Sequence, residues 1–168
     1  MKRKTLLISI LTILFASCMQ NKTEIGLEYH EAIIARQTEV LDAFEEALDA
    51  VTEDIEILQL KRENALNITR KAIKETEKIK IVENGEVLKK ESLHLLERIE
   101  NILSAKFQNI VEIREELNIR YSDELVDELN EIILISHDQI DSLIIEFNKA
   151  QIDFGNQYHF ELIEEIYD

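Results

Sequence analysis

Residues 24–58 read EIGLEYHEAIIARQTEVLDAFEEALDAVTEDIEIL, and two lines of mostly apolar side chains recur in them every seven residues. Two adjacent lines with this strict spacing keep one stripe of a helix against its partners, as in coiled coils and helical bundles. The stretch therefore predicts a long helix that packs in a bundle. One line is Leu27, Ile34, Leu41, Leu48 and Ile55, and the other is His30, Gln37, Phe44, Val51 and Leu58.

The composition of the whole chain also favours helices. Of its 168 residues 45 % are hydrophobic, three are glycine and none is proline. A disordered chain would have fewer apolar residues, and an all-β domain would need many turns rich in glycine and proline. A chain of this length is expected to form one domain with a single core.

The length of the first helix is open, because the second line of the repeat continues through Ala65, Ala72 and Ile79. Residues 24–80 could therefore form one helix or two. One helix would measure roughly 85 Å at about 1.5 Å per residue and would outrun the later helices. We therefore predict a break near Val51–Asp54.

Two later breaks have clear turn signals. Glu83-Asn84-Gly85 contains two residues that tolerate the left-handed conformation, and Ser122 is a natural N-cap. Short loops join antiparallel neighbours, so the predicted fold is all-α: an up-down-up-down antiparallel four-helix bundle over residues 24–168. Its helices are expected at about 24–51, 54–80, 86–118 and 123–154, with Phe107 and Phe147 buried between them.

The start of the chain has the form of an export signal. Lys2-Arg3-Lys4 precedes the apolar run 6–15, which is too short to span a bilayer, since a spanning helix needs about 20 apolar residues. The tetrapeptide Phe15-Ala16-Ser17-Cys18 resembles a bacterial lipobox. The resemblance implies a signal peptide over 1–17, cleavage before Cys18, a diacylglycerol on its thiol and acylation of the new amino terminus. Residues 18–23 would then be a polar tether.

Other interpretations of this segment are an ordinary secretory signal with an incidental cysteine, or an uncleaved anchor. A lone exposed thiol at a secreted amino terminus would be unusual, which favours the lipoprotein. Because Cys18 is the only cysteine, a disulfide within the chain is excluded.

Charge restricts the partners of the chain. Its 19 Lys and Arg residues stand against 35 Asp and Glu, a net charge of −16. Loss of residues 1–17 would remove three positive charges and leave −19. Such a surface repels phosphate backbones, so we expect no nucleic-acid binding. It also repels anionic lipid headgroups, so the body of the bundle is expected to stand away from the membrane.

Three stretches resemble a family of small bacterial surface lipoproteins of spirochaetes and Bacteroidetes whose function is unknown. They are Glu28–Gln37, Asn84–Lys90 and Phe147–Leu162. The resemblance implies a helical architecture and a lipid-anchored location in the bacterial cell envelope, at the outer membrane. It implies no activity.

A polar layer is predicted at one end of the bundle. His30 and Gln37 occupy seam positions where Leu or Ile would pack, and Tyr29 lies beside them. If the first and last helices are antiparallel, Gln151 reaches the same end. The layer could be a hydrogen-bonded set that fixes helix register, as buried amides do in coiled coils, or it could line a small-molecule pocket.

The sequence gives little support to catalysis or to a resident metal. Di-iron bundles use two Glu-x-x-His motifs, whereas this chain has one, Glu91 to His94, with His94 expected on the side opposite to Leu96. Ser136-His137-Asp138 cannot form a triad by adjacency, since successive helical residues point about 100° apart. We therefore expect no enzyme activity, no cofactor and no metal site.

The resulting hypothesis is a non-catalytic, lipid-anchored surface module with a possible protein partner. The alternative is a ligand- or metal-binding carrier that uses Tyr29, His30, Gln37 and Gln151. Chain order fixes the orientation, because a short tether at Cys18 keeps the start of the first helix near the bilayer. The Glu83-Asn84-Gly85 turn and the end of the chain should share that end.

Overall fold

The structure is a computed structural model that describes the backbone of residues 2–162 and the side chains of residues 21–162. The described residues form helices and no strand. In chain order the elements are α1 (Lys2–Asp49), the 3₁₀ turn η1 (Ala50–Thr52), α2 (Ile55–Lys78), α3 (Glu86–Asn101), the π-helical turn η2 (Ile102–Lys106), α4 (Phe107–Ile119) and α5 (Asp123–Tyr158).

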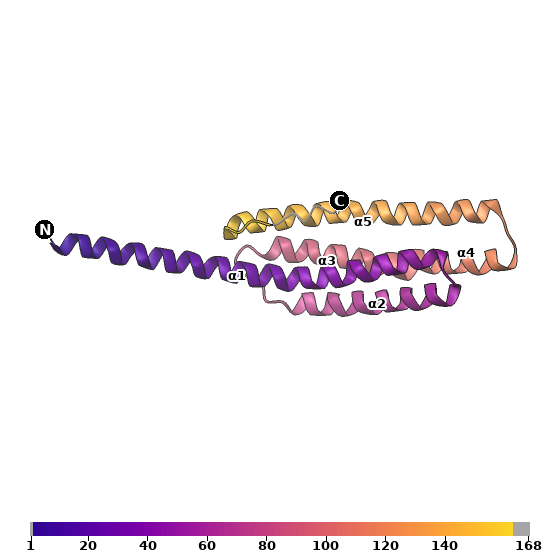
Figure 1. The fold of residues 1–168 in the computed structure, drawn as a ribbon, viewed down its shortest axis with the longest axis horizontal. Coiled ribbons are helices and arrows are strands. Elements are labelled where there is room, and N and C mark those ends of the chain that lie inside the picture. Colours follow the sequence, from indigo (N-terminus) through magenta and orange to yellow (C-terminus); the bar gives the residue numbers. More distant parts are fainter. Residues whose placement is uncertain (1, 163–168) are drawn as a thin grey trace.

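These elements make four antiparallel rods, because α3, η2 and α4 follow one another without a gap and form the third rod (Figure 1). Consecutive rods contact each other, and α5 also contacts α1. The predicted four-helix fold is confirmed. In Figure 1 the amino-terminal part of α1 extends beyond the ends of the other helices.

The predicted break in residues 24–80 is present, so this segment contains two helices. After η1 the backbone is extended at Glu53 and Asp54, and Asp54 stands at the N-cap position of α2 without a side-chain cap. Arg114 on α4 donates a hydrogen bond of 2.8 Å to the Glu53 carbonyl. The turn before α3 is also confirmed, with Asn84 in the left-handed conformation at φ 58°.

Two helix ends differ from the prediction. The expected tether, residues 18–23, is part of α1, and no glycine or proline precedes Gly26 to interrupt the helix. The last helix continues through Gly155 to Tyr158, because Gly155 is buried inside it with the backbone of Phe160 packed above. The helix then ends at His159, whose φ is 60°.

The core stripe of α1 is centred differently from the predicted seam. The line that starts at His30 is buried, whereas the line that starts at Leu27 is only half-buried. A third line lies wholly in the core: Gly26, Ile33, Val40 and Ala47. α1 contacts α2, α3 and α5, so it needs a wider inward face than a helix with one partner.

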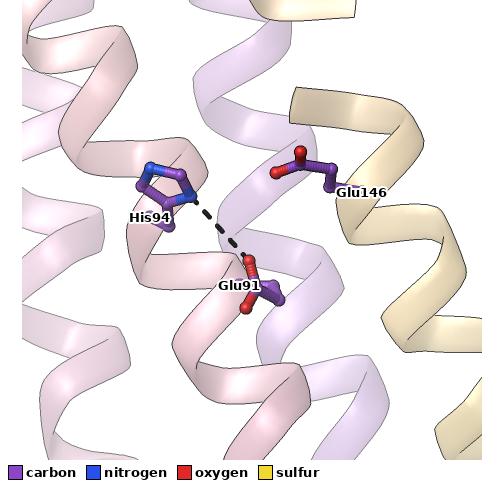
Figure 2. Close-up of side chains that lie close together, drawn as sticks. All are labelled: Glu91, His94 and Glu146. Carbon is purple, nitrogen blue, oxygen red and sulfur yellow. Dashed lines mark ion pairs between the residues drawn. The ribbon is translucent and has the colours of Figure 1, made fainter. Parts of the chain in front are cut away.

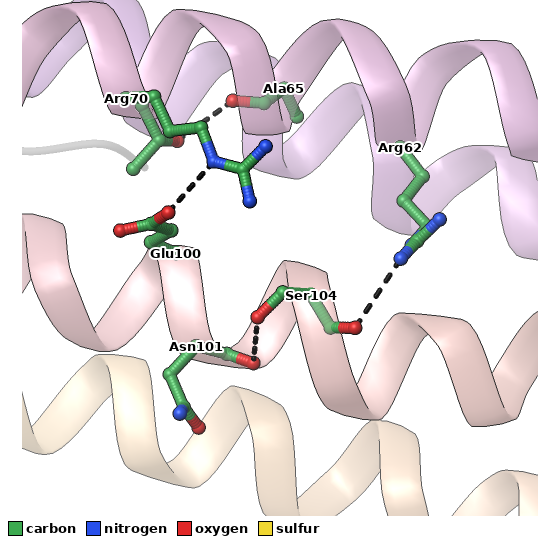
Figure 3. Close-up of polar contacts among 7 residues, drawn as sticks. Arg62, Ala65, Arg70, Glu100, Asn101 and Ser104 are labelled. Carbon is green, nitrogen blue, oxygen red and sulfur yellow. Dashed lines mark hydrogen bonds and ion pairs between the residues drawn. The ribbon is translucent and has the colours of Figure 1, made fainter.

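The π-helical turn η2 was not predicted. A π turn widens the helix and disturbs its regular hydrogen bonds. Arg62 on α2 donates to two carbonyls there. The distance is 2.8 Å to the Leu103 carbonyl and 3.3 Å to the Ser104 carbonyl, and Figure 3 draws the contact with Ser104. Two helical turns further along α2, Arg70 pairs with Glu100 at 2.8 Å. The irregular turn thus lies where a guanidinium can supply its carbonyls with donors.

Three segments meet at one end of the bundle, as predicted from chain order. The Tyr158 hydroxyl donates to the Glu83 carbonyl at 2.7 Å, and Thr23 Oγ1 donates to the Tyr158 carbonyl at 2.9 Å. The ring of Tyr158 lies directly on Gly26, where a Cβ would be 2.2 Å from the ring. The start of the packed part of α1, the α2–α3 turn and the end of α5 are therefore tied together.

Candidate functional site

The predicted polar layer exists at this end of the bundle, but its members bind separate partners. His30 Nε2 and Gln151 Oε1 are 3.0 Å apart, which links α1 to α5 as antiparallel packing predicts. The Gln151 amide also donates to Asn148 at 2.9 Å. The ring of Phe160 covers His30, with the ring centroids 5.4 Å apart.

Gln37 faces α3 instead. Its amide nitrogen donates to the carbonyl of buried Ser92 at 3.0 Å and makes a short contact with the Ser92 hydroxyl. Its own Oε1 is buried without a hydrogen-bond partner. Gln37 therefore fixes the register between α1 and α3 and does not meet His30 or Gln151 in a common hydrogen-bond network.

Tyr29 binds the α2–α3 turn. Its hydroxyl donates 2.8 Å to the Gly85 carbonyl, and a side chain at Gly85 would meet its ring at 2.8 Å. Burial, with a smaller contribution from the nearby charge of Glu86, raises the pKa of Tyr29 to about 12. The phenol thus stays protonated and keeps its donor role at any physiological pH. This geometry favours a structural layer over a ligand pocket.

Acid is expected to destabilise the fold through His30. Burial lowers the pKa of His30 below its ordinary value of 6.5, although the Gln151 hydrogen bond opposes the shift. The unfolded chain therefore takes up the proton first, so the free energy of unfolding should fall as the pH drops through 6.5 and level off below the folded pKa.

The measurement is urea unfolding of wild type and His30→Gln between neutral pH and about pH 5.5. The variant should lose this part of the pH dependence, whereas His137→Gln, at a side chain that is 58 % exposed, should keep it. Identical pH profiles for wild type and His30→Gln would contradict the assignment.

A second group of polar residues, on the surface between α3 and α5, was only partly visible in the sequence. Glu91 and His94 are one helical turn apart on α3, and Glu146 approaches them from α5 (Figure 2). One donor atom from each lies within 4.8 Å of the others. An imidazole and two carboxylates are donors that zinc and related ions accept.

This group of polar residues nevertheless has the character of a hydrated charge cluster. The His94 side chain is 48 % exposed and Glu146 is exposed as well. Lys90 Nζ lies 3.0 Å from Glu91 Oε1, so one carboxylate already has a cation. Exposed clusters of acidic groups are common without a metal, and we assign none here.

The Ser136-His137-Asp138 tripeptide is not arranged for nucleophilic catalysis. Ser136 is buried and its hydroxyl donates 2.6 Å to the Ile132 carbonyl. His137 is exposed and faces Asp141 at 3.2 Å, one turn along α5. The lipidation prediction at Cys18 concerns a side chain outside the described residues.

Comparisons with protein families, with curated proteins and with solved structures found no match for this chain. The resemblance to bacterial surface lipoproteins therefore rests on the residues quoted above. Among the described helices, none combines the length and the apolar character needed to cross a bilayer.

Proposed function

We propose that this chain is a lipid-anchored, non-catalytic module of the bacterial cell envelope, held at the outer membrane through Cys18, that binds a protein partner along the outer face of α5. The anchor is supported by the lipobox-like Phe15-Ala16-Ser17-Cys18 and by the basic and apolar segments before it. A ligand carrier has less support, because the groups of the polar layer are largely bound to protein atoms.

The observation that supports the partner surface most directly is a line of exposed aliphatic side chains on α5. Leu134, Ile145 and Ile152 are 62 %, 69 % and 49 % exposed. At about 100° per residue their positions fall within roughly 20° of one another around the helix. They span about 27 Å along its axis, since each residue adds about 1.5 Å.

The location and charge of this line suit a partner helix or strand with basic residues. α5 is the rod at the top of Figure 1, and its three aliphatic side chains are exposed in the part of the chain that the structure describes. Asp138 and Asp141 are exposed on the same side of α5. Apolar contacts at the centre with charges at the rim are the usual composition of a protein interface. Single exposed aliphatic residues need no explanation, whereas an aligned series on one helix face favours binding.

Crosslinking in living cells tests this surface. A photoreactive amino acid at position 145, or at position 134, should capture a discrete partner. Adding Ile145→Asp to the variant that is photoreactive at position 134 should lower capture from position 134 by roughly tenfold, if the buried contact is worth about 1.4 kcal/mol. The matched control is position 60, because Leu60 on α2 is similarly exposed at 66 %.

A photoreactive residue at position 60 should not capture the same partner. Equal capture from positions 145 and 60, or capture that Ile145→Asp leaves unchanged, would remove the outer face of α5 from the proposal.

A further inference from the structure

A groove of about 630 Å³ lies at the end of the bundle where the three segments meet. Its residues come from α1, from the α2–α3 turn and from the last turn of α5. Tyr158 lines the groove but is only 2 % exposed, so the accessible apolar surface comes from Ile25 and Ile81, which are 45 % and 44 % exposed. The turn residue Val82 lines the same groove and packs partly on the core.

Two lysines stand at the edge of this apolar groove. Lys22 Nζ lies 5.4 Å from the centroid of the Tyr158 ring, which is within the range of a cation–π contact. Its distance to Glu83 Oε2 is 4.0 Å, a loose ion pair. Lys80 is exposed and lines the groove from the α2–α3 turn. Aliphatic groups bordered by lysines bind well at a bilayer interface. The methylene chains of the lysines enter the apolar region, and their ammonium groups contact the lipid phosphates.

The position of the groove along the chain relates it to the proposed anchor. Asn21 lines the groove and comes three residues after Cys18 in the same helix, so about 4.5 Å of axial rise separates them. Ile25 is about 10 Å from Cys18 on the same scale. The headgroup layer of one leaflet is roughly 5 to 8 Å thick. A lipid on Cys18 would therefore leave no spacer between the bilayer and the groove.

From these observations we infer that the groove lined by Ile25, Ile81 and Val82 docks on the phospholipid headgroup layer, with Lys22 and Lys80 binding lipid phosphates. The inference rests on the proposed anchoring at Cys18. Because the groove lies to one side of α1, docking tilts the bundle toward the α2–α3 turn. Only this side of the end face touches lipid, while the acidic remainder of the chain points away from the membrane.

The chain offers a clean reporter for this contact because it contains no tryptophan. Full-length protein, processed in cells and purified in detergent, is placed in vesicles that contain a minority of anionic phospholipid and brominated lipid as a quencher. A single tryptophan replaces Ile81 in the groove, Ile152 on the outer face of α5, or Ile119 at the far end of α4. All three native residues are exposed, at 44 %, 49 % and 86 %.

The expected result is quenching of Ile81→Trp that is roughly threefold stronger than that of Ile152→Trp or Ile119→Trp, since interfacial groups lie within about 5–10 Å of the acyl boundary. Adding Lys80→Glu to Ile81→Trp should lower the ratio of docked to undocked protein, as read from the quenching, by about fivefold. This is the effect expected when one lysine contact with an anionic surface is lost. Quenching at Ile81→Trp no stronger than at the other two positions would overturn the inference.

Flotation of the vesicles separates this question from anchoring. Protein that floats with the vesicles but shows no selective quenching refutes the groove and keeps the anchor. Protein that does not float refutes the acyl anchor. In that case the free Cys18 thiol is coupled to a maleimide-bearing lipid, and the same three tryptophan positions then decide whether the groove docks.

Discussion

Phe107→Ala is expected to lower the free energy of unfolding by about 3 to 5 kcal/mol, the range for removing a buried aromatic ring. Phe107 has no exposed surface and is the first residue of α4, directly after the π-helical turn. Its ring packs edge to face on Phe44 of α1, with the centroids 5.6 Å apart. Truncation therefore removes the apolar area of the ring and leaves a cavity between two rods.

Urea unfolding followed by circular dichroism measures this loss. Tyr121→Ala is the matched control, because Tyr121 is an aromatic residue of similar size that is 76 % exposed. Its substitution should change the free energy of unfolding by less than about 0.5 kcal/mol. A loss below about 1 kcal/mol for Phe107→Ala would mean that the core closes over the missing ring or that the packing of α4 is wrong.

The sequence predicted the turn between α2 and α3 well because a strong local signal marks it. Asn84-Gly85 offers the left-handed conformation, and Asn84 adopts it. The break after Asp49 had only weak capping signals and was inferred from the length that a continuous helix would have. In the structure this break is held by the hydrogen bond from Arg114 to the Glu53 carbonyl. The two residues are 61 positions apart in the chain, so no local sequence pattern contains this contact.

Features that depend on three-dimensional neighbours were missed. The inward line of Gly26, Ile33, Val40 and Ala47 contains small residues that score poorly as hydrophobic anchors, yet Gly26 is required by the ring of Tyr158. The register that brings Glu146 beside Glu91 and His94 comes from packing between α3 and α5.

In the polar layer, the order and direction of the helices predicted one hydrogen-bonded pair correctly and a second contact wrongly. Antiparallel first and last helices predicted that His30 and Gln151 would meet, and they do. The same reasoning grouped Gln37 with them, whereas its amide binds Ser92 on α3. Seven residues turn a helix through about 700°, some 20° short of two full turns, so a seven-residue line drifts toward a new neighbour unless the helices supercoil.

Cys18→Ala is expected to abolish lipid attachment altogether. In the proposed pathway the thiol of Cys18 receives the diacylglycerol and the chain is cut before this residue. Two or three acyl chains hold a protein on a membrane stably, with each buried methylene contributing about 0.8 kcal/mol. Without the thiol no diacylglycerol is attached, so the effect on labelling should be all or none rather than graded.

The measurement is incorporation of labelled palmitate together with the mass of the amino-terminal peptide. Partitioning alone would mislead, because an uncleaved apolar run at residues 6–15 could keep the precursor at the membrane. Wild type should carry label and start at Cys18, whereas Cys18→Ala should carry no label and keep residues 1–17. Ser17→Ala is the control, since alanine is also small and should leave acylation and cleavage intact. Label retained by Cys18→Ala, or an unmodified Cys18 thiol in wild type, would refute the anchor and leave the partner surface on α5 to be tested by itself.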